Sequence, residues 1–564
     1  MDAGLPTTQH RDDSIDRAIA YVEERRVLVE VVALTAAIVI FLISVMPNLA
    51  NHPAVTDDEI WVLSASYKLA NEGVFGSDMF AGFYNADKHY FFNMPLHHFV
   101  VAGVIKVLGA GVAEARFASV LYGIATIFLT YAIARKVAGV PVALLSLGLL
   151  LFLRLNIGFD TGLPLQELSS NMRYDLAPVP FMLGGVLLLL NRVSLGRCLM
   201  AGALFGIAFL LQFYGAFIIP AVIAYLWLEP VERRERLKLI GAMIATTVIV
   251  VLPYAGLSLA YYDDFKGQAG TIDQRADFSD PGFYIDNLKD EPDRFLRPLA
   301  FKEIPRGEDP RTTPPQFLSL SETLTRRPSA KLAVIVGLPA ALIFMAYWAV
   351  RDRNRGYQML VLCLAGLVAE FALLDQTKFL MYWIPVVPFL SIGMAAVSWW
   401  LLSRVREGRV QLAMGGVAAA LLLLIAAEGS VARLSGIRTA NQSTNYASIG
   451  AALHETIPPG SKVVGSTSMW WGMRDMDYRS YFLFFYLTRD DAGPYKTTIT
   501  GFLDDFQPDY VVLTGLAWGE LEDHLIKAHY DELLGYLDSH ATIVRTLQGP
   551  EFKTYGYIEV WQFR

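Results

Sequence analysis

The sequence predicts a polytopic α-helical membrane protein with about eleven membrane-spanning helices and a small α/β domain at its C-terminal end. Hydrophobic residues make up 54% of its 564 residues, whereas charged residues make up only 18%. This composition is too apolar for a soluble protein of this length. Apolar runs of spanning length recur through residues 27–427, and residues 434–564 return to an ordinary soluble composition.

The first part of the chain predicts a cytoplasmic segment and then a membrane anchor. Residues 1–26 are polar, with a short helical pattern over 7–26, and they do not resemble a cleavable signal peptide. The first span is expected at 27–46. Later spans are expected at 115–134, 140–157, 176–190, 199–228, 239–257, 332–350, 359–374, 379–401 and 412–427. The run 199–228 is too long for one span, so we expect two helices that separate near Tyr214 and Gly215.

Charged residues in the loops predict the orientation. Every second loop is short and basic, as the positive-inside rule requires when the N-terminus is cytoplasmic. The basic residues are Arg135, Lys136, Arg192, Arg197, Arg233, Arg234, Arg236, Lys238, Arg351, Arg353, Arg355, Arg404, Arg406 and Arg409. We therefore expect a multi-pass protein of the plasma (inner) membrane whose C-terminal domain is periplasmic or extracellular.

Charge and cysteine content exclude other classes of site. A net charge of −7 argues against a nucleic-acid partner, which would require a basic face. The two cysteines, Cys198 and Cys363, lie in or beside apolar runs, so they predict neither a disulfide framework nor a cysteine metal site.

Three substantial pieces are expected on the outer side. A transmembrane domain over 27–433 would carry two outer loops, 51–112 and 258–331, and the second is rich in Asp, Pro and Gly. The third piece is the extracytoplasmic domain, 434–564. Strands are expected there at 462–465, 510–513, 541–547 and 558–563, and a helix at 520–537, an alternation typical of an α/β domain.

The first outer loop contains the strongest candidate site. Thr56 is followed by Asp57, Asp58 and Glu59, and then by a helical pattern that ends at Gly73. A capping box explains Thr56 and Glu59 without any catalysis, but it leaves Asp57 and Asp58 unexplained. Ionised groups beside hydrocarbon are costly, so these carboxylates are candidate catalytic residues in a helix at the membrane interface.

Other polar residues at the outer ends of spans are candidate substrate-binding groups. They are Lys88 and His89 in the first outer loop, Arg173 and Asp175 before the fourth span, and Lys378 and Tyr382 late in the chain. Each also has an ordinary explanation, such as a solvated ion pair or an interfacial anchor. Neighbouring residues on a helix point about 100° apart, so His97 and His98 together make a poor metal site. We therefore predict no metal site, although acidic clusters can hold a divalent cation.

These residues occur in an order that resembles the lipid-dependent membrane glycosyltransferases of the GT-C fold, specifically the protein O-mannosyltransferase and aminoarabinose transferase group. The matching residues are Asp58, Glu59, Met94, Pro95, Leu96, Arg116, Arg173, Asp175, Lys378, Tyr382, Pro385 and Pro388. The resemblance covers residues 27–402. One departure concerns the position before Pro95, where the family often has lysine and this chain has Met94.

The resemblance implies transfer of a sugar from a polyprenyl-phosphate carrier to an acceptor on the outer face of the membrane. It implies that Asp58 is the general base, with Asp57 as the competing candidate. Because Met94 replaces the lysine, Lys88, Arg173 and Lys378 are alternative partners for the lipid phosphate. Direct displacement predicts inversion at the anomeric carbon, and the acceptor is a glycan, a glycolipid or a protein.

Two other functions explain parts of the sequence. A transporter predicts inverted repeats and ionisable residues in mid-span, and the sequence shows neither. A non-catalytic envelope assembly protein predicts that the acidic cluster only caps a helix. A helix N-terminus should lower the pKa of an aspartate there, whereas burial should raise it, and sequence alone does not decide between the two effects.

Overall fold

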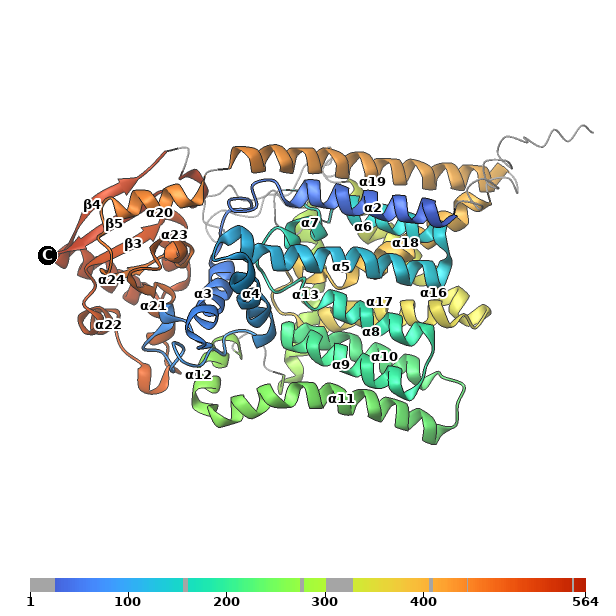
Figure 1. Ribbon diagram of the computed structural model, residues 1–564, viewed down its shortest axis with the longest axis horizontal. Helices are drawn as coiled ribbons and strands as arrows, with labels where there is room; N and C mark the ends of the chain where they lie inside the picture. Colours follow the sequence, from blue (N-terminus) through green and yellow to red (C-terminus); the bar gives the residue numbers. More distant parts are fainter. Residues whose placement is uncertain are drawn as a thin grey trace, which may run out of the picture.

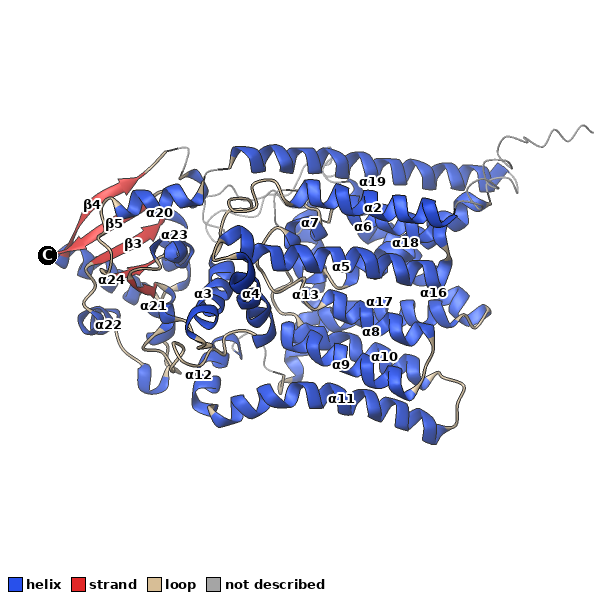
Figure 2. Cartoon of the chain, in the orientation of Figure 1, coloured by secondary structure: helices blue, strands red, loops and turns tan. Residues whose placement is uncertain are grey.

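The computed structural model describes residues 26–155, 161–273, 278–300, 328–404, 409–443, 445–549 and 552–564. Residues 7–25 of the helix expected over 7–26 and part of the outer loop 258–331 lie outside these residues. The described chain forms a bundle of long helices with a smaller mixed domain at one end, and a layer of short helices lies between them (Figure 1). Figure 2 shows that strands occur only in the smaller domain within the described residues.

Seven helices of the described chain are long and apolar enough to cross a membrane. They are α2 (Arg26–Val45), α5 (Val112–Ala138), α11 (Arg233–Ala260), α16 (Leu338–Arg351) with its preceding turns α15 (Pro328–Lys331) and η3 (Leu332–Gly337), α17 (Arg355–Leu374), α18 (Val386–Ser403) and α19 (Arg409–Gln442). The other expected spans are shorter apolar helices: α6 (Val140–Phe152), α8 (Val179–Asn191), α9 (Leu195–Leu211) and α10 (Ile218–Trp227). The polytopic helical fold is therefore confirmed.

Two short turns interrupt the apolar runs of the bundle. The long run 199–228 does divide, because α9 ends at Leu211 and the short turn η2 (Phe213–Phe217) precedes α10. The span expected at 379–401 begins later, at Val386, because η4 (Leu380–Trp383) forms a separate turn before Pro385. Both turns contribute a tyrosine to the site described below.

The outer loop 258–331 was expected to be irregular, and this expectation was wrong for its described part. That part forms α12 (Tyr262–Asp273) and α13 (Pro281–Ala300). The Asp, Pro and Gly content suggested a loop, but Pro281 is the first residue of α13, where a missing N–H costs nothing. Asn287 and Arg294 of α13 then bond to backbone oxygens of α17, at Leu373 and Phe371.

The layer between the bundle and the mixed domain is built by the first outer loop. It contains α3 (Asp57–Glu72), the turn η1 (Asp78–Phe80) and α4 (Pro95–Leu108), with α7 (Pro164–Ser169) beside them. Gly73 ends α3 in the left-handed conformation, at φ 74°, where a glycine is favoured. One face of α3 lies against the mixed domain. Its Trp61 and Tyr67 pack edge-on against Phe482 and Trp471 of the mixed domain, with ring centroids 5.3 and 5.4 Å apart.

The mixed domain contains one five-stranded sheet in the order β2-β1-β3-β5-β4. The strands are β1 (Lys462–Gly465), β2 (Asp477–Ser480), β3 (Tyr510–Thr514), β4 (Ala541–Leu547) and β5 (Ile558–Phe563). β1 pairs in parallel with β2 and β3, and β5 is antiparallel to β3 and β4. The helices are α20 (Tyr446–His454), α21 (Phe482–Leu487), α22 (Ile499–Phe506), α23 (Gly515–His524) and α24 (Lys527–His540), with the turns η6 (Thr467–Met473), η7 (Gly493–Tyr495) and η8 (Lys553–Tyr555).

Two details of this domain differ from expectation. The helix expected at 520–537 is two helices, because the chain leaves helical geometry at Leu525. The strand β2 was missed, since four residues that include Asp477 and Arg479 give no apolar pattern. The α/β character of the domain is nevertheless confirmed.

Candidate active site

Glu59 fixes the start of α3 inside the protein. Its carboxylate accepts hydrogen bonds from Arg116 Nε at 2.8 Å, from Arg116 Nη2 at 2.7 Å and from the Met172 amide at 2.8 Å. The Glu59 and Arg116 side chains are both fully buried. Arg116 also donates to the carbonyl of Leu49, so one ion pair ties together the end of α2, α3, α5 and the segment after α7.

Asp58 points to a different partner. It forms an ion pair with Nη1 of Arg173, and Nε of the same guanidinium donates to Asp175 Oδ2 at 2.7 Å. The Asp58 side chain remains 53% exposed, whereas Arg173 is 10% exposed and Asp175 is fully buried. The guanidinium Nη2 makes no hydrogen bond with any residue that the structure describes. A largely buried cation therefore lies beside an accessible carboxylate, although the two residues are far apart in sequence.

Two tyrosines from the helix breaks complete this cluster. The Tyr214 hydroxyl, from η2, donates to the Asp175 carbonyl at 2.7 Å. Tyr382, from η4, packs on Tyr214 with ring centroids 6.2 Å apart. Burial raises the pKa of Tyr382 to about 12, so its phenol remains a hydrogen-bond donor at neutral pH. The structure thus brings Asp58, Arg173, Asp175 and Tyr382 together.

Asp57 faces the mixed domain. Its Oδ1 accepts from the Ser468 amide at 2.6 Å, and its Oδ2 lies 3.2 Å from the Tyr481 hydroxyl. That hydroxyl also contacts Glu520, and one O–H can donate to only one carboxylate at a time. Burial, reinforced by the negative charge of Glu520, raises the pKa of Asp57 to about 7, and burial also raises the pKa of Glu520. For Asp57, burial therefore outweighs the hydrogen bonds from Ser468, which lower the pKa.

Lys88 and His89 lie away from this cluster. The Lys88 side chain is exposed, and His89 Nδ1 lies 2.9 Å from Asp264 of α12. The His89 ring also stacks on Tyr261, with centroids 3.6 Å apart. His89 therefore connects the first outer loop to α12.

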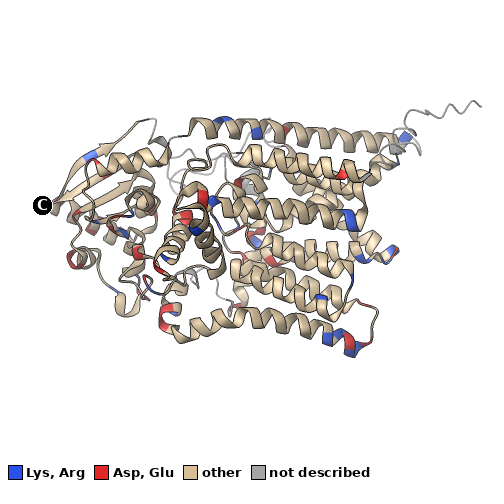
Figure 3. Ribbon diagram, viewed as in Figure 1, with Lys and Arg blue, Asp and Glu red and all other residues tan. Residues whose placement is uncertain are grey.

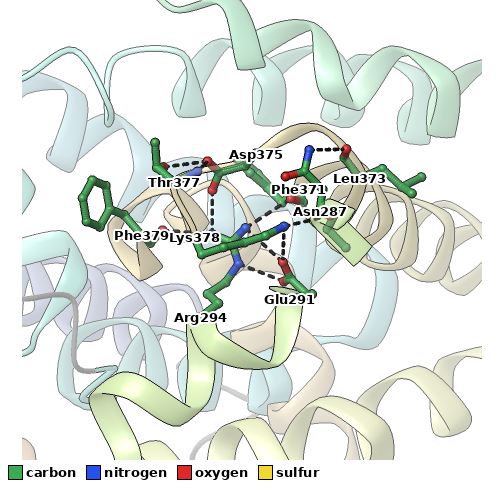
Figure 4. A network of polar contacts seen from close by, with 10 residues as sticks. Asn287, Glu291, Arg294, Phe371, Leu373, Asp375, Thr377, Lys378 and Phe379 are labelled. Atoms are coloured by element: carbon green, nitrogen blue, oxygen red, sulfur yellow. Dashed lines mark hydrogen bonds and ion pairs between the residues drawn. The ribbon is translucent and has the colours of Figure 1, made fainter. Parts of the chain in front are cut away.

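Lys378 belongs to a separate ionic network that attaches α13 to the end of α17 (Figure 4). Its Nζ lies 3.0 Å from Glu291 and donates to the Ala372 carbonyl at 2.9 Å. Arg294 bonds both Glu291 and Asp375 at 2.8 Å. Two cations and two carboxylates thus neutralise one another, and Lys378 is only 4% exposed.

The adjacent histidines do not converge on a common point. His97 Nε2 lies 2.8 Å from the Met172 carbonyl, and His98 Nδ1 lies 3.2 Å from the Val62 carbonyl. Burial lowers the pKa of both, so the rings are neutral donors to backbone oxygens. The described residues contain no group of three or more His, Cys, Asp or Glu side chains that could hold a metal ion.

Comparison with known proteins identifies the architecture. The profile of the family described as dolichyl-phosphate-mannose-protein mannosyltransferase matches residues 93–256. ArnT from Cupriavidus metallidurans, solved bound to undecaprenyl phosphate, is 14% identical with a TM-score of 0.55, over 94% of this chain and 97% of that one. The chain has the GT-C fold. The family match and this fold together indicate a glycosyltransferase.

Two further solved GT-C structures are similar. Both are Archaeoglobus fulgidus oligosaccharyltransferases. The apo form is 14% identical with a TM-score of 0.54, over 86% of this chain and 70% of that one. AglB in complex with an inhibitory peptide and a dolichol-phosphate is 12% identical with a TM-score of 0.55, over 94% of this chain and 74% of that one. No curated protein sequence matches this chain.

Sequence reasoning missed several residues that contact the candidate carboxylates. Ser468, Tyr481 and Glu520 come from the mixed domain, and Tyr214 comes from a break between two apolar helices. None has a local motif. Only Tyr214 had a sequence signal, because it lies at the break expected in the long run 199–228.

Proposed function

We propose that this GT-C glycosyltransferase moves a sugar from a polyprenyl-phosphate carrier to an acceptor hydroxyl at the outer face of the membrane, with inversion. The observation that carries the proposal is the contact between Asp58 and Arg173. It places an accessible carboxylate beside a largely buried guanidinium at the junction of the bundle and the mixed domain. The solved relatives bound to undecaprenyl phosphate and dolichol-phosphate support a carrier of this class.

The reaction follows from the charges of these groups. The acceptor oxygen attacks the anomeric carbon while the bond from that carbon to the phosphate oxygen breaks. Asp58 accepts the proton of the acceptor hydroxyl, as a general base does. The bonding electrons leave with the phosphate, and Arg173 stabilises the resulting charge. The products are the glycosylated acceptor and the polyprenyl phosphate.

The resting structure suggests an order of events at Arg173. Nη1 is occupied by Asp58, whereas Nη2 has no partner within the described chain. A donor phosphate would bind Nη2 first and then compete with Asp58 for Nη1. Donor binding would thereby release Asp58 to act as a base, while Asp175 holds Nε in place.

The other carboxylates have separate roles in this proposal. Asp57 remains the competing base, because a pKa of about 7 suits proton transfer at neutral pH. Its contacts with Ser468 and Tyr481 of the mixed domain favour a positioning role instead. Glu59 also positions the loop, because Arg116 and Met172 already occupy its buried carboxylate.

Arg173 is the preferred partner for the lipid phosphate. Lys378 is neutralised by Glu291, and His89 is held by Asp264, so neither offers a free charge. The Lys88 side chain is exposed, so it would contact a phosphate only at the outer edge of the site. Tyr382 would donate a hydrogen bond to the phosphate or to the sugar.

We infer the same orientation as the loop charges predict, in the plasma (inner) membrane. Figure 3 shows Lys and Arg gathered at the ends of the long helices that face away from the mixed domain. Under the positive-inside rule those ends are cytoplasmic, and the mixed domain is extracytoplasmic. The proposed partners are the lipid-linked donor, membrane lipid and a glycan, glycolipid or protein acceptor, with no nucleic acid.

The test is a donor panel. Purified protein is incubated with radiolabelled polyprenyl-phosphate sugars, and enzyme-dependent release of the sugar is measured. We expect release from at least one donor, and a loss of at least 100-fold in Arg173→Met. Arg489→Met, which removes a cation paired with Asp491 in the mixed domain, should retain activity. Release from none of these donors would contradict the proposal and favour a transporter or an assembly protein.

A further inference from the structure

A partly polar cavity lies beside the start of α3, and its described lining does not include Arg173. Its volume is ≈ 590 Å³, within the range of about 300–1,000 Å³ that small-ligand sites occupy. The walls come from the outer end of α2, the segment before α3, α7 with the following loop, α19, α20 and η8. The cavity therefore lies between the helical bundle and the mixed domain.

Two buried amides on the cavity wall each have one polar atom without a partner. Gln166 and Asn171 are 7% and 1% exposed. Gln166 Nε2 donates to the Ser44 carbonyl at 3.2 Å, and Asn171 Oδ1 accepts from the Arg173 amide at 2.7 Å. Gln166 Oε1 and Asn171 Nδ2 have no hydrogen bond within the described protein. An unmade hydrogen bond at a buried site is costly, so these atoms point to a ligand or ordered water that supplies it.

The remaining lining residues restrict the chemistry of that ligand. Among the described residues they include the carboxylate of Glu167 and the imidazole of His52 but no Lys or Arg, so a phosphate would meet a negative charge and no permanent cation among them. Most are Ser, Thr, Asn or Gln. The hydroxyls of Tyr446 and Tyr555 are already bonded to the carbonyls of Ser468 and Val55, so the two rings offer mainly apolar surface. Amides and hydroxyls beside aromatic rings suit a neutral ligand with many hydroxyl groups.

One short segment connects this cavity to the proposed catalytic groups. In the loop after α7, Asn171 lines the cavity, whereas Arg173 reaches Asp58 on the other side. Thr56, the residue before Asp57 and Asp58, also lines the cavity. Asp57 and Asp58 do not line the cavity themselves, but Thr56 joins them directly to its wall, and Asn171 joins Arg173 to the same wall.

We propose that this cavity binds the acceptor, and that the acceptor presents a neutral saccharide head group. This assignment rests on the proposed function, because it takes Asp58 or Asp57 as the base for an acceptor hydroxyl that extends past Thr56 from a head group held in the cavity. Gln166 Oε1 would accept a hydrogen bond from one sugar hydroxyl, and Asn171 Nδ2 would donate to another. A phosphorylated head group would be excluded for lack of a cation, and an extended peptide would find no sheet edge to pair with in this cavity.

The test measures saccharide binding separately from turnover. Neutral disaccharides, glucose 1-phosphate and a short peptide containing Ser and Thr are added to the full chain in lipid nanodiscs, and binding is followed by saturation-transfer NMR. We expect binding of at least one disaccharide and of neither other probe. Gln166→Met keeps the side-chain size and should weaken that binding at least fivefold.

Two further variants make the result specific. Asn171→Asp keeps the acceptor for the Arg173 amide but removes the donor, and it should also weaken disaccharide binding at least fivefold. Gln358→Met removes an amide that bonds Ala349 and Arg355 elsewhere in the bundle, and it should leave binding unchanged.

Three outcomes would overturn this assignment: preferential binding of the peptide or the sugar phosphate, equal weakening in all three variants, or water alone in the cavity with no probe bound. Donor hydrolysis by the wild-type protein is measured in parallel without acceptor. If hydrolysis is present but disaccharides do not bind, only the acceptor assignment fails. If the donor is consumed neither alone nor with the disaccharides present, the proposed function itself fails.

Discussion

At the scale of single residues, the three consecutive carboxylates at the start of α3 have different surroundings. Glu59 is enclosed by Arg116, Asp57 contacts the mixed domain, and Asp58 is accessible beside Arg173. Successive helical residues point about 100° apart, which separates the three side chains. One short sequence thus supplies a structural ion pair, a contact between domains and a candidate base.

Replacing Glu59 by Gln should destabilise the fold strongly. Arg116 would keep its charge in a fully buried position without a counter-charge, and breaking such a pair costs about 3–5 kcal/mol. Thermal unfolding in detergent measures the change. The matched control is Asp531→Asn, which breaks the exposed pair with Lys527 and should cost less than about 1 kcal/mol. Equal effects of the two variants would show that the buried pair is not structural.

Asp57 should make the contact between α3 and η6 sensitive to pH. Its pKa in the folded protein, about 7, lies above the ordinary aspartate value of 3.8, so the folded state binds the extra proton between these values. Asp57 therefore makes its full contribution to the free energy of unfolding below about pH 4, and this contribution is lost as the pH rises to about 7. Hydrogen exchange at η6 should be slower at pH 5.5 than at pH 8, after correction for the intrinsic pH dependence of exchange. Asp57→Asn should remove this difference, and an unchanged difference would assign it to another group.

At the scale of elements, helix ends rather than helix interiors build the site. Tyr214 and Tyr382 come from the turns η2 and η4, and Arg173 comes from the loop between α7 and α8. The outer helix α13 is held in place by the Lys378 network (Figure 4). The residue spacing placed these groups near span ends, but it could not show that Lys378 pairs with Glu291 rather than with a substrate.

Replacing Glu291 by Gln should loosen α13. Lys378 and Arg294 would both lose a carboxylate partner in a largely buried position. Hydrogen exchange over residues 281–295 should become at least tenfold faster. Asp286→Asn, which affects an exposed pair with Lys289 on the same helix, should have little effect. Unchanged exchange in the Glu291 variant would show that apolar packing alone holds α13.

At the scale of the whole molecule, the sequence was sufficient for the helical fold, the C-terminal α/β domain and the order of most elements. The length of an apolar run and the charge of a loop can each be read from a short stretch of sequence. The long apolar helices and the basic helix ends of the structure agree with both. The helices in 258–300 and the strand β2 were missed because their stability comes from partners distant in sequence. The same limit applies to the site, since Ser468, Tyr481 and Glu520 reach α3 only through the packing of the two parts.

The most direct test of this account is single-turnover transfer by Asp58→Asn with the donor that the wild-type protein uses. Loss of a general base typically costs a factor of about 10² to 10⁴, so we expect at least a 100-fold slower chemical step. Donor affinity should increase, because the neutral amide introduced by this substitution would compete less for Arg173. A rate within threefold of wild type, with donor affinity unchanged, would contradict the role of Asp58 and the exchange at Arg173.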